Sequence, residues 1–311
     1  MLSRVADSLY WMSRYFERAS HCARVLEANY NLMLNPGKIS TEKRWYAVLA
    51  QLGLGDEAAT LDPQAALLLL MSDASNSSSI VSCITSAREN ASQVREQISS
   101  EMWEGLNQLY HEVVQASAGI HDDSDVTRLF AAIREGMYKF SGVTDASMNH
   151  GEAWQFIQLG KYMERTSALP ALLDAVYSTS EGADDLDWVG LLSSCSAFEA
   201  YCKVYTADLQ PPLIAEFLLL NPEFPYTVRY STEKMTEALE AIKKISRARR
   251  AGQIERIVGR LHSSLAYAQI DDIISKDFPR FLKSIVDQCQ KLHSAVHEVY
   301  IDYPIETAFE A

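Results

Sequence analysis

Apolar residues recur every three or four positions along most of the chain, which is the spacing of one face of an α-helix. Glycine and proline are sparse, 13 and 9 of 311 residues, and no Asn-Gly or Asp-Gly pair marks a hairpin between alternating runs. The pattern therefore predicts an all-α protein without a sheet. The expected helices are 2–34, 42–53, 63–73, 78–98, 100–118, 124–141, 151–178, 185–206, 211–219, 229–247, 252–269 and 276–301.

One helical phrase occurs twice, as YWMSRYFERASHCARVL at 10–26 and IQLGKYMERTSALPALL at 157–173. At a separation of 147 residues, the phrases match Arg14 to Lys161, Glu17 to Glu164 and Arg18 to Arg165. Weaker matches follow in the same order, Trp45 with Trp188, Ser79-Ile80 with Thr227-Val228, and Arg128-Leu129-Phe130 with Arg280-Phe281-Leu282. We expect a tandem duplication, with related helical units at 1–148 and 149–311 packed as one compact body. Chance similarity among amphipathic helices is the alternative.

The adjacent Glu and Arg of each phrase point about 100° apart on a helix. Glu17 shares a polar stripe with Arg14, whereas Arg18 lies on a mostly apolar stripe. Arg165 sits among apolar residues in the second phrase. Because an unpaired buried charge is strongly unfavourable, both arginines are expected to be buried against a carboxylate. Such an arginine either forms a structural bridge between helices or binds the carboxylate or phosphate of a ligand. Spacing alone favours the structural bridge.

The segment 76–107 is unusually polar for an interior helix. Arg88 and Arg95 share one of its faces, and the pattern favours hydrogen-bonded packing against another charged helix, with Glu89 and Glu101 as candidate partners for Arg18. A solvated face explains the same pattern equally well.

Composition excludes several classes of function. The net charge of −13 argues against nucleic acid or an anionic membrane as the main partner. The apolar run 65–71 is far shorter than the roughly 20 residues of a membrane span, and the N-terminus lacks the apolar block of a signal peptide. Five cysteines without CxxC spacing indicate reduced thiols. We expect a cytoplasmic protein.

The sequence gives no indication of a metal or cofactor. His293 and His297 are four residues apart, a spacing that can chelate a metal on a helix. The second phrase, however, has Ala168 where the first has His21, so no symmetric metal pair is expected. Neither a GxxxxGK[ST] loop nor a GxSxG elbow is present.

Longer motifs carry a resemblance to a known family. They are MLSRVADSLYWMSRYFERA, SARENASQVREQISSEMWEGLN, FIQLGKYMERT, EFLLLNPEFPYTVRY and LHSSLAYAQIDDI. Over nearly its whole length the chain resembles the alpha-E family, bacterial all-helical proteins named for a Glu-Arg motif. Tyr226-Thr227 departs from the Arg-Ser expected after Phe224-Pro225. The resemblance implies association with circularly permuted ATP-grasp ligases and transglutaminase-like peptidases, and hence a system that makes amide bonds or modifies proteins.

Three hypotheses for function follow. In the first, the chain is a helical partner of an ATP-grasp amide or peptide ligase, and it binds the ligase or an anionic amino-acid or peptide ligand. The candidate ligand-binding residues are Arg14, Glu17, Arg18, Lys161, Glu164, Arg165, Arg88 and Arg95. The second is an independent enzyme acting on a peptide or amino acid with a Glu as general base, and the third is a structural scaffold. We prefer the first because no nucleophile–base pair or metal set can be identified.

Overall fold

The computed structural model describes residues 1–34, 41–54, 61–118, 123–178, 185–246 and 252–301, and it contains only helices over these ranges. The first six helices are α1 (Ser3–Leu34), α2 (Thr41–Gln51), α3 (Pro63–Met71), α4 (Ile80–Gln93), α5 (Ser100–Ala118) and α6 (Asp123–Ser147). They are followed by α7 (Glu152–Ser178), α8 (Asp185–Ser194), α9 (Phe198–Tyr205), α10 (Pro211–Leu220), α11 (Val228–Ser246), α12 (Gly252–Ala266), α13 (Ile270–Val296) and the π-helical turn η2 (His297–Ile301). The all-α prediction is confirmed.

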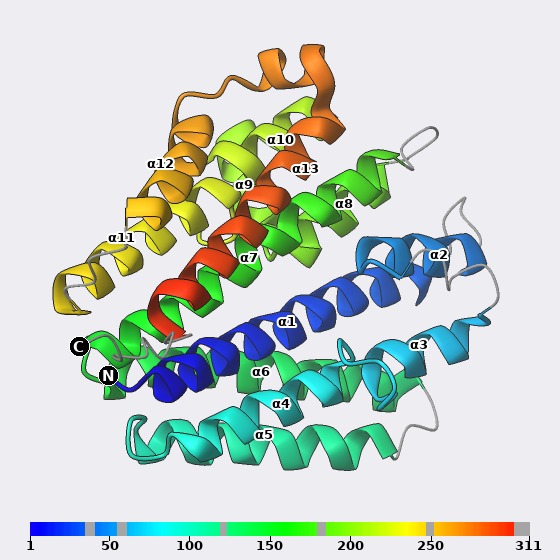
Figure 1. Cartoon of the computed structure of the whole chain (residues 1–311). Coiled ribbons are helices and arrows are strands. Elements are labelled where there is room, and N and C mark those ends of the chain that lie inside the picture. Colours follow the sequence, from blue (N-terminus) through cyan, green and yellow to red (C-terminus); the bar gives the residue numbers. More distant parts are fainter. Residues whose placement is uncertain (35–40, 55–60, 119–122, 179–184, 247–251, 302–311) are drawn as a thin grey trace, which may run out of the picture.

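Two long helices, α1 and α7, lie side by side through the middle of the molecule (Figure 1). On one side α1 packs on α4, α4 on α5, α5 on α6, and α6 returns to α1. On the other side α7 packs on α11, α11 on α12, α12 on α13, and α13 returns to α7. The Glu-Arg phrases are on α1 and α7, so they meet at the centre.

The two central helices run in the same direction and approach closely. The amino group of Met1 contacts Glu152 at 2.9 Å near their beginnings. At the crossing, a Cβ added to Gly160 would lie 2.1 Å from Ser13 Oγ and 2.3 Å from the carbonyl oxygen of Tyr10. Only glycine leaves room for this approach, which brings the charged side chains of α1 and α7 within reach of each other.

Local sequence signals fix several helix starts. Proline occupies the first position of both α3 and α10, where its missing N–H breaks no helical hydrogen bond. The hydroxyls of Ser79 and Thr227 accept hydrogen bonds from the third residue of α4 and of α11, at 3.2 and 3.1 Å. The ordered turn expected at 221–225 is present, because Asn221 Oδ1 accepts from the backbone N–H groups of Glu223 and Phe224.

Several helix boundaries differ from those that periodicity predicts. Helix α6, expected to end at 141, continues to Ser147. The segment 185–206 is two helices, since Ser196 adopts a positive φ of 51° between α8 and α9. The helix expected to reach 98 ends at Gln93. Helix α13 starts before 276, but its backbone is non-helical at Asp277, whose carboxylate accepts from the N–H of Arg280 and restarts the helix.

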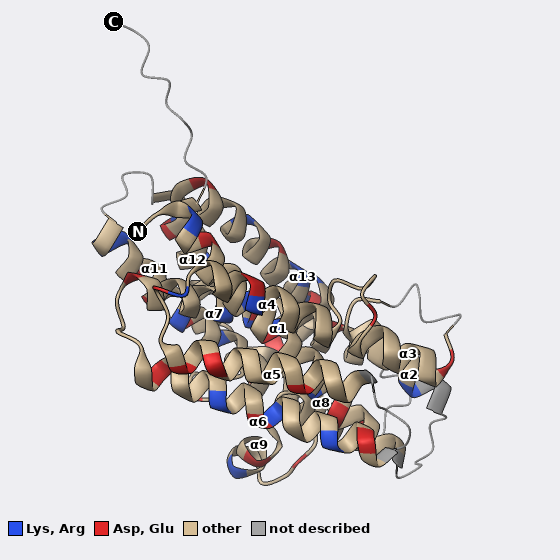
Figure 2. Ribbon diagram, turned by 90° about the horizontal axis from the view of Figure 1, so that it is seen from below, with Lys and Arg blue, Asp and Glu red and all other residues tan. Residues whose placement is uncertain are grey.

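The cysteines, the apolar content of the helices and the distribution of charged residues can be compared with what the composition predicts. Cys22, Cys83, Cys195 and Cys289 are buried free thiols and Cys202 is a half-buried one, which agrees with the prediction of reduced cysteines. Among the described helices, none has both the length and the apolar composition needed to cross a bilayer. Acidic and basic residues are mixed along the helices (Figure 2).

Candidate functional site

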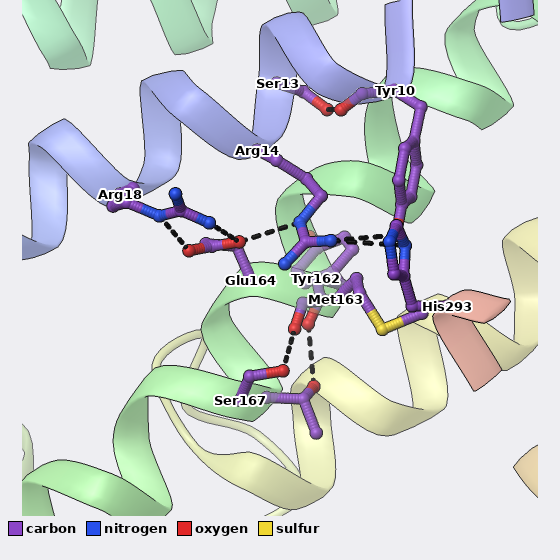
Figure 3. Close-up of polar contacts among 10 residues, drawn as sticks. Tyr10, Ser13, Arg14, Arg18, Tyr162, Met163, Glu164, Ser167 and His293 are labelled. Atoms are coloured by element: carbon purple, nitrogen blue, oxygen red, sulfur yellow. Dashed lines mark hydrogen bonds and ion pairs between the residues drawn. The ribbon is translucent and has the colours of Figure 1, made fainter. Parts of the chain in front are cut away.

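The two Glu-Arg phrases are joined to each other across the α1–α7 contact. Arg165 donates from Nε to Glu17 Oε1 and from Nη2 to Glu17 Oε2, both at 2.9 Å. In the reciprocal pair, Arg18 donates from Nε to Glu164 Oε1 at 2.6 Å and from Nη2 to Oε2 at 3.2 Å. Arg14 adds a bond from Nε to Glu164 Oε2 at 2.7 Å, so Glu164 holds two arginines (Figure 3). We call these side chains the ER cluster.

The partners expected for Arg18 from the sequence are wrong. Glu89 and Glu101 are exposed and make no ion pair with it. The reason is the face that α4 turns to α1, which consists of small and apolar side chains: Ile80, Cys83, Ile84, Ala87 and Ala91. Likewise Arg14 pairs with Glu164 of the other helix, not with Glu17 on its own.

The two equivalent arginines differ in burial. The side chain of Arg165 is 7% exposed and that of its partner Glu17 is 5% exposed. Arg18 is 28% exposed, although Glu164 beneath it is only 9% exposed. The prediction of a buried, paired arginine is therefore confirmed for Arg165. Arg18 is paired but only half-buried.

The guanidinium of Arg165 is covered by further protein groups besides Glu17. Its Nη1 donates to the carbonyl oxygen of Pro225 at 2.8 Å, and its guanidinium lies 3.7 Å from the centre of the Tyr226 ring. Arg24 also stacks on Tyr226, at 4.2 Å, and donates to the Tyr226 hydroxyl at 2.8 Å. Arg24 further contacts Glu17 at 3.5 Å. Neither Arg24 nor Tyr226 is among the ligand-binding residues predicted from the sequence.

A group of aromatic residues surrounds Arg14. Its guanidinium lies 4.8 Å from the centre of the Trp11 ring and 3.3 Å, at Nη1, from His293 Nδ1. The same His293 nitrogen is 2.9 Å from the hydroxyl of Tyr10 (Figure 3). Helix α13 thereby closes the beginning of the α1–α7 contact, and His293 is engaged with Tyr10 and Arg14.

Electrostatics in the ER cluster favour charged carboxylates and a neutral histidine. Burial raises the pKa of Glu17, but the guanidinium groups of Arg165 and Arg24 outweigh it and hold that pKa below its usual value. At Glu164, burial likewise raises the pKa of the carboxyl group, but the guanidinium groups of Arg14 and Arg18 outweigh it and hold that pKa below its usual value. Burial and the charge of Arg24 lower the pKa of His21 to about 4.

Lys161 occupies the position in α7 that corresponds to Arg14. Burial, and then the charge of Arg165, lower the pKa of its ammonium to about 8. It lies 5.3 Å from the centre of the Tyr162 ring, and within the described ranges it forms no hydrogen bond or ion pair. The shorter lysine thus does not reproduce the contact that Arg14 makes with the opposite glutamate.

A cavity borders the ER cluster on the Arg18 side. Its volume is about 200 Å³, and its lining includes Arg18, His21, Gln51, Leu52, Ser78 and Glu164. The matching space beside Arg165 and Tyr226 measures only about 10 Å³. Glu17 borders this small space and another of about 30 Å³. Arg18 and its partner Glu164 are therefore the residues of the ER cluster that meet the larger cavity, while Glu17 is covered by Arg165 and Arg24.

Comparison with known proteins identifies the family. A family model described as a predicted alpha-helical domain with a conserved ER motif matches residues 1–301. The chain belongs to the Alpha-E family. It is 23% identical over 319 aligned positions to the uncharacterized proteins Rv2567 of Mycobacterium tuberculosis and Mb2597 of Mycobacterium bovis. The match covers 95% of this chain and 36% of each relative, so the chain spans about a third of their length. No solved structure matches it.

The candidate residues Arg88 and Arg95 of this Alpha-E chain lie away from the ER cluster. Arg88 donates to Asn107 Oδ1 at 2.7 Å and stacks on Tyr110 at 4.7 Å. Arg95 stacks on Trp103 at 4.6 Å. Arg88 of α4 and Arg95 of the turn that follows it are thus both turned toward α5, and neither lines the cavity beside Arg18.

Proposed function

We propose that this Alpha-E chain is a non-catalytic helical partner of an ATP-grasp amide or peptide ligase and that it binds a small anionic amino-acid or peptide ligand for that system. The observation that carries the proposal is the state of the two motif glutamates. Each has both oxygens occupied by guanidinium groups and a lowered pKa. A general base needs a free oxygen and a pKa near the working pH.

The Arg18 cavity supports a binding role. Arg18 keeps its bidentate bond to Glu164 and still borders an open space, and a guanidinium at a cavity is suited to a carboxylate or phosphate. The glutamates thus position arginines, and the arginines supply the binding charge. This arrangement favours a binding module over an independent enzyme with a Glu base.

The relatives support a partnership with another activity. In the mycobacterial proteins the matched segment is about a third of a longer chain, so there the helical module is covalently attached to further sequence. A helical module that is fused to further sequence in one protein can bind the equivalent of that sequence as a separate polypeptide in another protein. The ligase itself comes from the family resemblance, and ATP-dependent ligation is consistent with a cytoplasmic location.

We also infer that 1–148 and 149–311 are tandem related units. Three observations support this. The helices pack in the same circular order around α1 and around α7. Helices α3 and α10 each start with proline, and α4 and α11 are each capped by a hydroxyl, at positions 148 residues apart. The Glu-Arg pairs also contact each other reciprocally.

The test of the proposed function is reconstitution with a circularly permuted ATP-grasp ligase of the kind that the family resemblance implies. The tagged chain is expected to retain the ligase in a pull-down and to raise ATP consumption in a coupled assay that contains amino-acid substrates. A charge-neutral Arg18→Gln variant is expected to keep the complex and lose part of the stimulation. Absence of a complex together with unchanged ATP consumption would refute the proposal.

A further inference from the structure

The cavity beside Arg18 and the small space beside Arg165 are built from corresponding positions. Ser78 lines the first and Tyr226 the second, 148 residues apart. Ala171 of α7 lines the cavity beside Arg18. The corresponding residue of α1 is Arg24, which is 147 positions earlier and lines the space beside Arg165. Each space also borders the glutamate of the opposite helix. The two differ mainly in what fills them.

On the Arg165 side, the protein fills the space with its own groups. The Tyr226 ring covers the guanidinium at 3.7 Å, and the Pro225 carbonyl accepts from Nη1 at 2.8 Å. Arg24 then fixes Tyr226 through its hydroxyl, at 2.8 Å. Arg165 therefore has a flat apolar cover and a third oxygen acceptor in addition to its carboxylate.

On the Arg18 side, each of these groups is missing. Ser78 is too small to cover the guanidinium, and Ala171 offers nothing to fix a cover in place. The carbonyl oxygen of Ser77, which corresponds to that of Pro225, accepts instead from Cys83 Sγ at 3.5 Å. Among the described residues nothing accepts a hydrogen bond from Arg18 Nη1, and the side chain is 28% exposed against 7% for Arg165.

The charge balance around the cavity favours an anion. Four arginines, Arg14, Arg18, Arg24 and Arg165, share the two carboxylates of the ER cluster. Lys161 adds a further cation next to them. Partly buried cations in excess of their carboxylates stabilise an incoming negative charge, most strongly at a guanidinium that still has a free N–H.

We propose that the cavity beside Arg18 binds a small carboxylate with a planar or apolar body, which takes the place that the Pro225 carbonyl and the Tyr226 ring take on Arg165. The carboxylate accepts from Arg18 Nη1, and the body stacks on the guanidinium. This inference rests on the proposed binding function and gives its ligand a chemical class.

The rest of the lining suits such a molecule. Leu52, Leu54 and Leu70 form an apolar wall, while Gln51 and Ser78 supply polar groups. The volume of about 200 Å³ is below the roughly 300–1,000 Å³ of sites for drug-sized ligands. A cavity of this size holds a single amino acid or an aryl acid, but it does not hold a long peptide.

Calorimetric titration of the isolated chain with phenylacetate tests the site, with phenylacetamide as the uncharged isostere. We expect saturable one-to-one binding of phenylacetate and at least about tenfold weaker binding of the amide. Butyrate, which lacks the planar body, is expected to bind between the two. Equal affinity for acid and amide, or no saturation by any of the three, would overturn the proposal.

Two exchanged variants make the test specific. Ser78→Tyr rebuilds the cover found over Arg165 and should lower phenylacetate affinity at least about tenfold, whereas Ser92→Tyr on the exposed face of α4 should leave it unchanged. Tyr226→Ser should open the second space and raise the stoichiometry toward two.

Thermal unfolding verifies that each variant is folded. If Ser78→Tyr does not fold, Arg18→Lys, which keeps the charge and loses the fork of donors, takes its place. Unchanged affinity in the folded variant would refute the site.

The ligase experiment and the titration fail independently. Loss of the ligase complex with intact phenylacetate binding would refute the proposed partner and leave the site. A ligase complex without carboxylate binding would do the opposite.

Discussion

Arg165 and Arg18 are corresponding residues in different surroundings, and their removal should differ in effect. Arg165→Ala leaves Glu17, which is 5% exposed, without its bidentate partner, and breaking a buried pair in this way costs about 3–5 kcal/mol. Arg18→Ala leaves Glu164 with Arg14 and removes a half-buried bidentate pair of charged hydrogen bonds, so we expect a loss of about 1.5–3 kcal/mol.

Urea unfolding of both variants against the wild type measures this difference. Equal losses would mean that Arg14 does not compensate for Arg18. A midpoint for Arg165→Ala within error of the wild type would contradict the closed geometry around Glu17. For the same reason, Glu17→Gln should destabilise the fold, because it leaves the guanidinium of Arg165 without a carboxylate.

The lowered pKa of the His21 side chain makes the stability of the fold depend on pH. Its pKa is about 4 in the fold against an ordinary value of about 6.5. Between these values the unfolded chain binds more protons than the folded one, so stability falls as the pH drops below about 6.5. The expected contribution lost at pH 5 is about 1–2 kcal/mol. His293, whose pKa is also lowered to about 4, acts in the same direction, and Glu17 and Glu164 add losses at lower pH.

The measurement is the urea midpoint at pH 7.5 and pH 5. His21→Ala, which places the residue of the corresponding position 168 at position 21, should reduce the difference between the two midpoints. A difference as large in His21→Ala as in the wild type would show that other groups carry the acid sensitivity.

At the residue scale, the sequence predicted which charges matter but not how they pair. A lone arginine on an apolar stripe indicated a buried pair, and Arg165 fulfils it. The partners lie about 147 positions away on a parallel helix, a distance that helical spacing within one element cannot resolve. Tyr226 stood out only as a departure from an expected Arg-Ser, and nothing local in the sequence shows that it covers Arg165.

At the scale of elements, the α1–α7 crossing depends on one glycine. Gly160→Ala would place a methyl 2.1 Å from Ser13 Oγ and 2.3 Å from the Tyr10 carbonyl. Backbone cannot move aside as a flexible side chain can, so we expect the helices to separate at a cost of about 1–3 kcal/mol. Gly142→Ala in α6 has no atom within 4 Å of the new Cβ and should stabilise the chain by about 0.5–1 kcal/mol.

Thermal unfolding of the two alanine variants should therefore shift the midpoint in opposite directions. A stabilised Gly160→Ala would mean that α1 and α7 are farther apart than described. A parallel drop in both variants would mean that the effect is not specific to the crossing.

Helix positions were largely predictable because apolar periodicity and capping residues are local. The proline starts of α3 and α10 and the hydroxyl caps of α4 and α11 are present in the sequence itself. The break between α8 and α9 was not, since Ser196 adopts its positive φ without a glycine. The ending of α4 at Gln93 was also missed, because apolar residues at Val94 and Ile98 continue the helical spacing into the following turn.

At the scale of the whole molecule, the buried charges of each half find partners in the other half. Glu17 is bound by Arg165, and Glu164 by Arg14 and Arg18. Neither half alone can satisfy its own central charges, and each would expose the face of α1 or α7 that the other covers. The halves are thus expected to behave as one cooperative unit, whatever their origin.

Cutting the chain between Asn149 and His150, in the connection from α6 to α7, tests this dependence. Co-expressed fragments 1–149 and 150–311 should associate into a one-to-one complex with a single unfolding transition. Each fragment alone should be poorly folded, because an unpaired buried charge costs several kcal/mol. Arg165→Ala in the second fragment should weaken the association at least about tenfold, while Arg229→Ala, which removes an ion pair within α11, should leave it unchanged. Two fragments that each unfold cooperatively as monomers would show that the cross-paired Glu-Arg motifs dock two stable domains, and do not complete a shared core.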